Sequence, residues 1–220
     1  MLRTGIPEST IFLDTILADS LICNLPETSR IWKEDINKVS LPKVLRTEYE
    51  NLLNSGLDSK ILYGKLQKYL FENFDYKRAF SDCLDKLKES ERALIYARSV
   101  KEAELLSKID GVTRYPDKNR KHVVTTYAEG SFGLNDLVIY NVLITRPPMP
   151  DLLPQMKGRL DRPGQESENL KLIYVLTEDT IEEASLLRME MAKQFRQDYI
   201  MPLAEFYDLA VNRRKISDFS

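Results

Sequence analysis

The most informative chemical pattern in the chain is a pair of arginines near a predicted helix end. Gln155, Arg159 and Arg162 stand at positions i, i+4 and i+7, so a helix would place all three on one face. Pro163 and Gly164 follow, which is typical of a helix end. Guanidinium groups are planar, permanently charged and bidentate toward phosphate, so this pair could stabilise the charge that develops at a γ-phosphate. The alternative is a solvated basic face with surface ion pairs.

The same predicted helix carries an apolar face and a glycine. Leu153, Met156 and Leu160 form the apolar face, which could dock on a sheet. Gly158 removes side-chain bulk beside the polar residues, so another backbone or a ligand could approach there.

Glycines also follow a predicted strand. Gly130 and Gly133 come after the run that begins at Val123, and they would let backbone amides face outward in a turn, which suits a phosphate oxygen. Asn135 could bond a ribose hydroxyl or a phosphate. The alternative is a turn built for tight packing.

A short basic segment precedes this strand. Between Thr113 and Val123 the chain has four basic residues and one acidic residue, Asp117. The segment could grip a nucleic-acid backbone, although an exposed charged turn has the same composition. The expected nucleic-acid contacts are Arg114, Lys118, Arg120, Lys121, Thr125 and Thr126.

Composition argues against several other classes of site. His122 is the single histidine, so neither a His-rich metal site nor a Ser/His/Asp triad is expected. Only Cys23 and Cys83 are present, without a CxxC pair, which favours a reducing intracellular setting, the cytoplasm or the nucleus. No apolar run is long enough for a membrane span, and the start of the chain lacks the pattern of a signal peptide. The net charge of −2 indicates that any nucleic-acid contact must come from local patches.

The order of predicted elements indicates the fold class. Residues 1–90 are predicted to be a helical linker or bracing segment, residues 91–200 a lobe, and residues 201–220 a tail. Expected strands of the lobe cover residues 92–97, 112–115, 122–127, 137–145 and 170–176, and expected helices cover residues 100–108, 151–162 and 180–199. This alternation predicts an α/β fold with a mostly parallel sheet and helices on both faces. In such folds function lies at the carboxyl ends of the strands.

Residues 155–165, Gln-Met-Lys-Gly-Arg-Leu-Asp-Arg-Pro-Gly-Gln, resemble the sixth helicase motif of superfamily-two ATPases of the Swi/Snf type. The six fixed positions of that motif are all present, as Gln155, Gly158, Arg159, Arg162, Gly164 and Gln165. Further segments are similar to other motifs of the family and follow the family's order, at residues 92–97, 110–113, 123–135 and 172–183. The resemblance covers roughly residues 90–195.

The resemblance implies that the chain carries the C-terminal, second RecA-like lobe of an ATP-dependent DNA translocase or helicase, with three layers. It implies that Arg159 and Arg162 are arginine fingers that reach ATP across a cleft, so both should be largely exposed in an isolated lobe. ATP and Mg²⁺ would be bound mainly by a first RecA-like lobe, in cis or in trans, and the nucleic acid would be duplex DNA, with RNA as the alternative. The nucleotide contacts implied on this lobe are Gly130, Gly133, Asn135, Gln155 and Gly158.

The sequence also departs from the family's pattern. The usual Ala-Gly-Gly of the fifth motif is Ala-Glu-Gly here, with one extra residue before Gly133, so the roles of Glu129 and Ser131 are open. The sequence contains no Gly-x-x-x-x-Gly-Lys-Ser/Thr loop and no acidic box for Mg²⁺, so the first lobe is expected to be absent and the isolated chain inactive. Two other functions stay open: a lobe of an RNA helicase or restriction-type translocase, and a non-enzymatic module that binds nucleic acid or protein.

Overall fold

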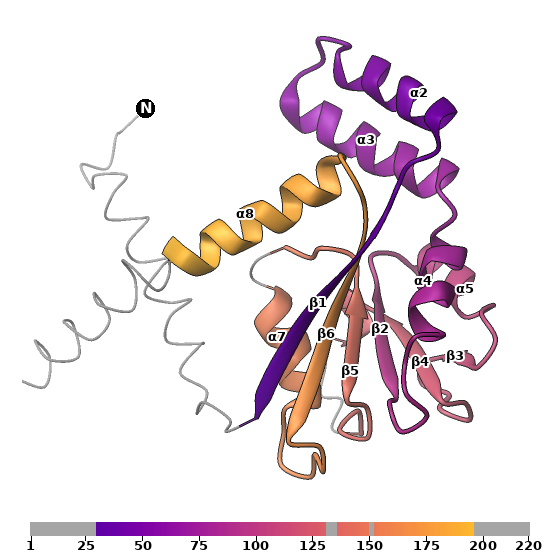
Figure 1. The fold of residues 1–220 in the computed structure, drawn as a ribbon, viewed down its shortest axis with the longest axis vertical. Helices are drawn as coiled ribbons and strands as arrows, with labels where there is room; N and C mark the ends of the chain where they lie inside the picture. The colour runs from indigo at the N-terminus through magenta and orange to yellow at the C-terminus, as the bar shows by residue number, and fades with distance from the viewer. Residues whose placement is uncertain (1–29, 131–135, 150–151, 196–220) are drawn as a thin grey trace, which may run out of the picture. The chain divides into compact units, whose positions relative to one another are not determined.

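The computed structural model describes residues 30–130, 136–149 and 152–195 of the 220-residue chain (Figure 1). Contacts group residues 28–189 into a first compact unit. The helices that precede the predicted lobe therefore belong to the same unit as the lobe. The predicted tail at residues 201–220 lies outside the described residues. In the described ranges, no helix combines the length and the apolar character needed to cross a membrane.

A parallel sheet forms the centre of the first unit. Its strands in the described residues are β1 (Ile31–Val39), β2 (Ala93–Ala97), β3 (Val112–Arg114), β4 (His122–Thr126), β5 (Val142–Thr145) and β6 (Asn169–Thr177). Their order is β1-β6-β5-β2-β4-β3, and every neighbouring pair is parallel. After β2 the chain builds β3 and β4 on one side and then crosses to β5 on the other. The strand order therefore reverses at β2, and the carboxyl ends around β2 are where ligands usually bind in such sheets.

Helices cover both faces of this sheet (Figure 1). The helices in the described residues are α2 (Lys43–Leu53), α3 (Ser59–Asn73), α4 (Tyr76–Leu84), α5 (Val100–Leu106), α6 (Tyr127–Gly130), α7 (Leu152–Leu160) and α8 (Ile181–Phe195). Of these, α2 and α3 lie above the carboxyl ends of the strands. Successive residues of a strand face opposite sides, so Ala93 and Ile95 of β2 pack with α4 and α5, whereas Leu94 and Tyr96 pack with α7. The expected α/β, RecA-like lobe with three layers is confirmed.

The first strand differs from the sequence prediction, which made residues 1–90 helical. β1 pairs with β6 along nine residues, from Ile31 opposite Asn169 to Val39 opposite Thr177. The apolar residues of this stretch do not alternate with polar ones, so no local pattern indicated a strand. Pairing with a segment far along the chain overrides the local pattern here.

The strand predicted at residues 137–145 is shorter than expected. Val142–Thr145 form β5, whereas residues 136–139 form turns. The Tyr140 N–H donates to the Leu137 carbonyl over 3.1 Å, and both side chains are buried on the α7 face of the sheet. The apolar character of this run therefore reflects a buried turn that leads into the strand.

His122 stands at the start of β4 and connects it to the start of β2. Its side chain is buried, and its Nδ1 accepts a hydrogen bond from the Ala93 N–H over 3.0 Å. Burial lowers the pKa of His122 to about 4, and the charges of Lys121 and Arg92 act in the same direction. The folded chain therefore holds the imidazole in its neutral form.

We predict that the folded state loses stability at His122 as the pH falls from about 6.5 toward 4. The histidine contributes fully above its unfolded-state pKa, and in this window the unfolded chain takes up a proton that the folded chain excludes. The loss should be about 2–3 kcal/mol between pH 7 and pH 4.5. Chemical denaturation at both pH values measures it, with His122→Gln as a variant that keeps a neutral acceptor. The prediction is wrong if the wild type and the variant show the same pH dependence.

Candidate functional site

Helix α7 carries the first part of the segment that resembles the sixth motif, as far as Leu160, and it packs on the sheet. Leu153, Met156 and Leu160 are buried there, as their apolar pattern predicted. Arg159 lies between these positions on the helix and is only 9 % exposed, whereas Gln155 is exposed. Because a helix turns once every 3.6 residues, position 159 shares the sheet-facing side with its apolar neighbours.

The expectation that both arginines are largely exposed is wrong for Arg159, which is buried. The helix ends at Leu160, before Arg162, so the polar residues do not share one face of a continuous helix. Arg162 is half-buried, and its Nε donates to the Gly158 carbonyl over 2.7 Å. A side chain on Gly158 itself would meet no described atom within 4 Å. Open space therefore lies beside the helix at the position where the sequence predicted an approach by another group.

A buried tyrosine lies close to both guanidinium groups. Tyr96 of β2 packs in the same cluster as α7 and stacks on Tyr127 of α6, with ring centroids 5.9 Å apart. Burial raises the pKa of Tyr96 to about 12, and the charges of Arg159 and Arg162 oppose this rise. Burial also lowers the pKa of Arg159, and the charge of Arg162 adds to this effect. The site therefore concentrates positive charge in a partly dehydrated setting, which favours an anionic ligand.

The turn after β4 adjoins this helix. β4 ends at Thr126, the single-turn helix α6 ends at Gly130, and α6 packs against α7 and β2. Gly133 and Asn135, the other predicted phosphate contacts, lie outside the described residues. The structure thus places the beginning of the glycine-containing turn next to α7, which carries Arg159.

Glu129, whose role is open from the sequence alone, closes the turn of α6. The Thr126 N–H donates to Glu129 Oε2, and the Glu129 N–H donates to Thr126 Oγ1, each over 3.2 Å. This reciprocal pair is a capping box, and the spacing Thr-x-x-Glu could have indicated it. Thr125 Oγ1 lies 3.4 Å from the same carboxylate, and both threonines are buried. Neither predicted threonine therefore presents its hydroxyl to solvent in this structure.

The predicted basic segment holds most of its cations next to carboxylates. Three ion pairs form there: Arg114–Glu129, Lys118–Asp136 and Arg120–Asp110. The Nη2 atom of Arg114 is 2.5 Å from Glu129 Oε1. Lys121 instead donates to the Lys88 carbonyl over 3.2 Å. The segment is thus a surface of paired charges and not a bare basic patch.

A buried ion-pair network lies at the carboxyl ends of β2 and β5, and no sequence motif indicated it. Arg146 directly follows β5, and its side chain is 3 % exposed. Its Nε lies 2.5 Å from Glu182 Oε1, and its Nη1 lies 3.1 Å from Glu102 Oε1. The guanidinium also lies 4.0 Å from the ring centroid of Tyr76 and donates to Gln67 Oε1 over 3.2 Å.

This network joins the preceding helices to the lobe. Its members outside the sheet ends are Gln67 of α3, Tyr76 of α4, Glu102 of α5 and Glu182 of α8. Figure 1 shows α3 above the carboxyl ends of the strands, and Gln67 accepts there from both Arg98 and Arg146. Burial alone would raise the pKa of Glu182, but the charges of Arg146 and Arg98 lower it overall. The position at which many such sheets bind a ligand is therefore filled by the protein's own charged groups.

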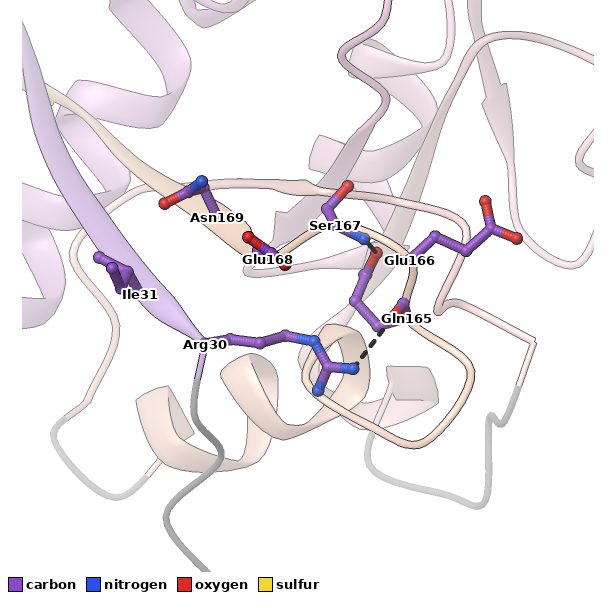
Figure 2. Close-up of a pocket in the computed structure, with 7 residues that line it drawn as sticks. All are labelled: Arg30, Ile31, Gln165, Glu166, Ser167, Glu168 and Asn169. Atoms are coloured by element: carbon purple, nitrogen blue, oxygen red, sulfur yellow. Dashed lines mark hydrogen bonds between the residues drawn. The ribbon is translucent and has the colours of Figure 1, made fainter.

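A polar pocket of about 330 Å³ lies at the opposite end of the sheet, where β1 and β6 begin (Figure 2). It is lined by Arg30, Ile31 and residues 165–169. Arg30 donates to the Gln165 carbonyl over 2.9 Å. The buried Gln165 amide in turn donates to the carbonyls of Tyr140 and Leu160. In this structure Gln165 therefore joins loops, and the predicted contact residues Gln155, Gly158, Arg159 and Arg162 lie outside the pocket lining.

Comparisons with known proteins found similarity to a viral protein and to a solved structure. The chain is 43 % identical over 220 residues to a protein of Acanthamoeba polyphaga mimivirus named "Putative helicase L115", across 98 % of this chain and 18 % of that protein. The chain thus spans less than a fifth of the length of this relative. Among solved structures it is similar to the C-terminal part of the Fun30 ATPase domain, with a TM-score of 0.45 and 16 % identity, over 71 % of this chain and 88 % of that one. No family model matches.

Proposed function

We propose that this chain is the C-terminal RecA-like lobe of an ATP-driven, Swi/Snf-type motor that moves along duplex DNA. The observation that carries the proposal is the proximity of Arg159 and Arg162 at the end of α7, beside the turn that follows β4. The identity of 43 % to part of the mimivirus protein named "Putative helicase L115" supports the same class of function. In this proposal a first lobe holds most of the ATP and its Mg²⁺, and the two guanidinium groups approach the γ-phosphate.

The electrostatics of the site fit a phosphate ligand. Arg159 is buried and repelled by Arg162, so its cationic form lacks part of the stabilisation that water would give it. A triphosphate brought by the other lobe would supply opposite charge to both groups. The further nucleotide contacts that we propose are Gly158 and the exposed Gln155 on α7, and Gly130, Gly133 and Asn135 after β4.

The nucleic-acid part of the proposal predicts a salt-dependent interaction of this chain with duplex DNA. A variant with alanine at all four cations of the basic segment (Arg114, Lys118, Arg120 and Lys121) should bind more weakly. The plot of log K against log salt slopes downward, and it should become shallower by about one unit for every phosphate that the variant no longer neutralises. Fluorescence anisotropy with a labelled duplex over a range of salt concentrations measures both quantities. Identical affinity and slope for the two proteins would exclude the segment from binding, and stronger binding to RNA would favour an RNA helicase lobe.

A further inference from the structure

The ion pairs of the basic segment share an arrangement. Arg114 ends β3, and Lys118 lies between β3 and β4. The carboxylates that pair with them, Glu129 and Asp136, come just before and just after residues 130–135, the predicted glycine turn. Two cations expected to contact nucleic acid are therefore each held by an acid from a neighbouring stretch of chain.

These acids cancel the positive charge of the surface. The segment has four cations, and four carboxylates stand within it or pair with it, namely Asp110, Asp117, Glu129 and Asp136, so the sum is zero. The side chains of the Arg114–Glu129 pair are 26 % and 40 % exposed, and those of the Lys118–Asp136 pair are 30 % and 44 % exposed. Ion pairs this close to water are weak, so a competing anion can exchange with them readily.

The pairing of Arg114 leaves part of its guanidinium unused. Glu129 Oε1 accepts from Nη2, while Glu129 Oε2 accepts from the Thr126 N–H of the cap. In this structure only one oxygen of the carboxylate contacts the arginine. The Nη1 atom of Arg114 is buried and has no hydrogen-bond partner in the part of the chain that the structure describes. A phosphate that displaces Glu129 could accept from Nη2 in its place.

We propose that Glu129 and Asp136 are resident counter-anions, which hold Arg114 and Lys118 until the phosphates of a DNA backbone displace them. This inference rests on the proposed nucleic-acid function and adds a regulation to it. A polyanion replaces both carboxylates in one binding event, because its phosphates are linked. The two acids therefore weaken DNA binding and favour an extended backbone over single small anions.

The test is duplex-DNA binding by the 220-residue chain with Glu129→Gln and Asp136→Asn combined. The amide side chains keep acceptor oxygens for the cap, and Asp136→Asn alone leaves the cap untouched. We expect the double variant to bind on the order of tenfold more tightly at low salt, with a smaller gain at high salt. Adding Arg114→Ala and Lys118→Ala should remove the gain. Asp136→Asn alone should shift the affinity in the same direction.

A matched control separates local displacement from net charge. Glu72→Gln with Asp82→Asn removes the same two charges from exposed ion pairs with Lys68 and Arg78 on α3 and α4. Because these acids lie outside the basic segment, we expect a change below about twofold. The counter-anion inference is wrong if both double variants gain the same DNA affinity, or if the variant at Glu129 and Asp136 binds DNA without any gain. Either result would leave the proposed function standing. Absence of DNA binding in the wild type and all variants overturns the nucleic-acid part of the proposed function as well.

Discussion

Replacement of Arg162 by alanine in the two-lobed protein that we propose should lower DNA-stimulated ATP turnover on the order of a thousandfold. The guanidinium would meet its full opposing charge only in the transition state, so its loss raises the barrier without a matching effect on folding. The side chain is half-buried at the end of α7, and we expect its removal to change stability by about 1 kcal/mol or less. Arg162→Lys should not restore turnover, because an ammonium group cannot reproduce the bidentate fork.

Arg159→Ala should reduce turnover to a similar extent but should also destabilise the lobe. Its side chain is 9 % exposed and lies on the side of α7 that packs on the sheet, so truncation removes buried packing. Steady-state turnover and thermal melting, measured on the same samples, separate the two effects. Arg78 of α4, which is 79 % exposed, provides the control, and its replacement by alanine should alter neither quantity. Turnover that survives the loss of both Arg159 and Arg162 would contradict the finger hypothesis.

Loss of the Arg146 side chain should have the largest effect on stability. Arg146→Met leaves the carboxylates of Glu102 and Glu182, which are 1 % and 0 % exposed, without their shared cation. The lowered pKa of Glu182 indicates that the folded protein holds it charged. The variant therefore buries two carboxylates with only the partly exposed Arg98, 4.0 Å from Glu182, to balance them. We expect a loss of about 3–5 kcal/mol in the free energy of unfolding.

Chemical denaturation of the 220-residue chain measures the effect of Arg146→Met. Arg46→Met is the matched control, because it breaks the exposed pair with Asp179 and should cost only about 0–1 kcal/mol. If the two variants lose the same small amount, the network does not hold the helices to the lobe in the way that the structure indicates.

The strands of the lobe could be predicted because they are buried on both faces and therefore read as continuous apolar runs. β2 and β4 are buried at every position, and β6 is buried along most of its length. β1 could not be predicted in this way, since it is a half-exposed strand whose only neighbour in the described residues is β6. Its apolar residues follow no strand period, and its conformation depends on a distant segment.

The sequence could predict which residues form the candidate site, but it could not predict which of them are exposed. Arg159 and Arg162 could be selected from their spacing, but the spacing does not say which side of α7 the sheet covers or that the helix ends at Leu160. The Arg146 network had no sequence signal, because its members come from α3, α4, α5, α8 and the end of β5. Only the folded sheet brings such separated residues together. The capping role of Glu129 did have a local signal, in its distance of three residues from Thr126.

The central claim is tested most directly by ATP turnover of the complete protein with and without duplex DNA, measured beside that of the 220-residue chain. We predict that duplex DNA stimulates ATP hydrolysis by the complete protein. For the 220-residue chain, whose sequence contains neither a phosphate-cradling loop nor an acidic box for Mg²⁺, we predict none above background. The claim is contradicted if the chain alone hydrolyses ATP in a manner that Arg162→Ala abolishes, or if hydrolysis by the complete protein is the same with and without DNA.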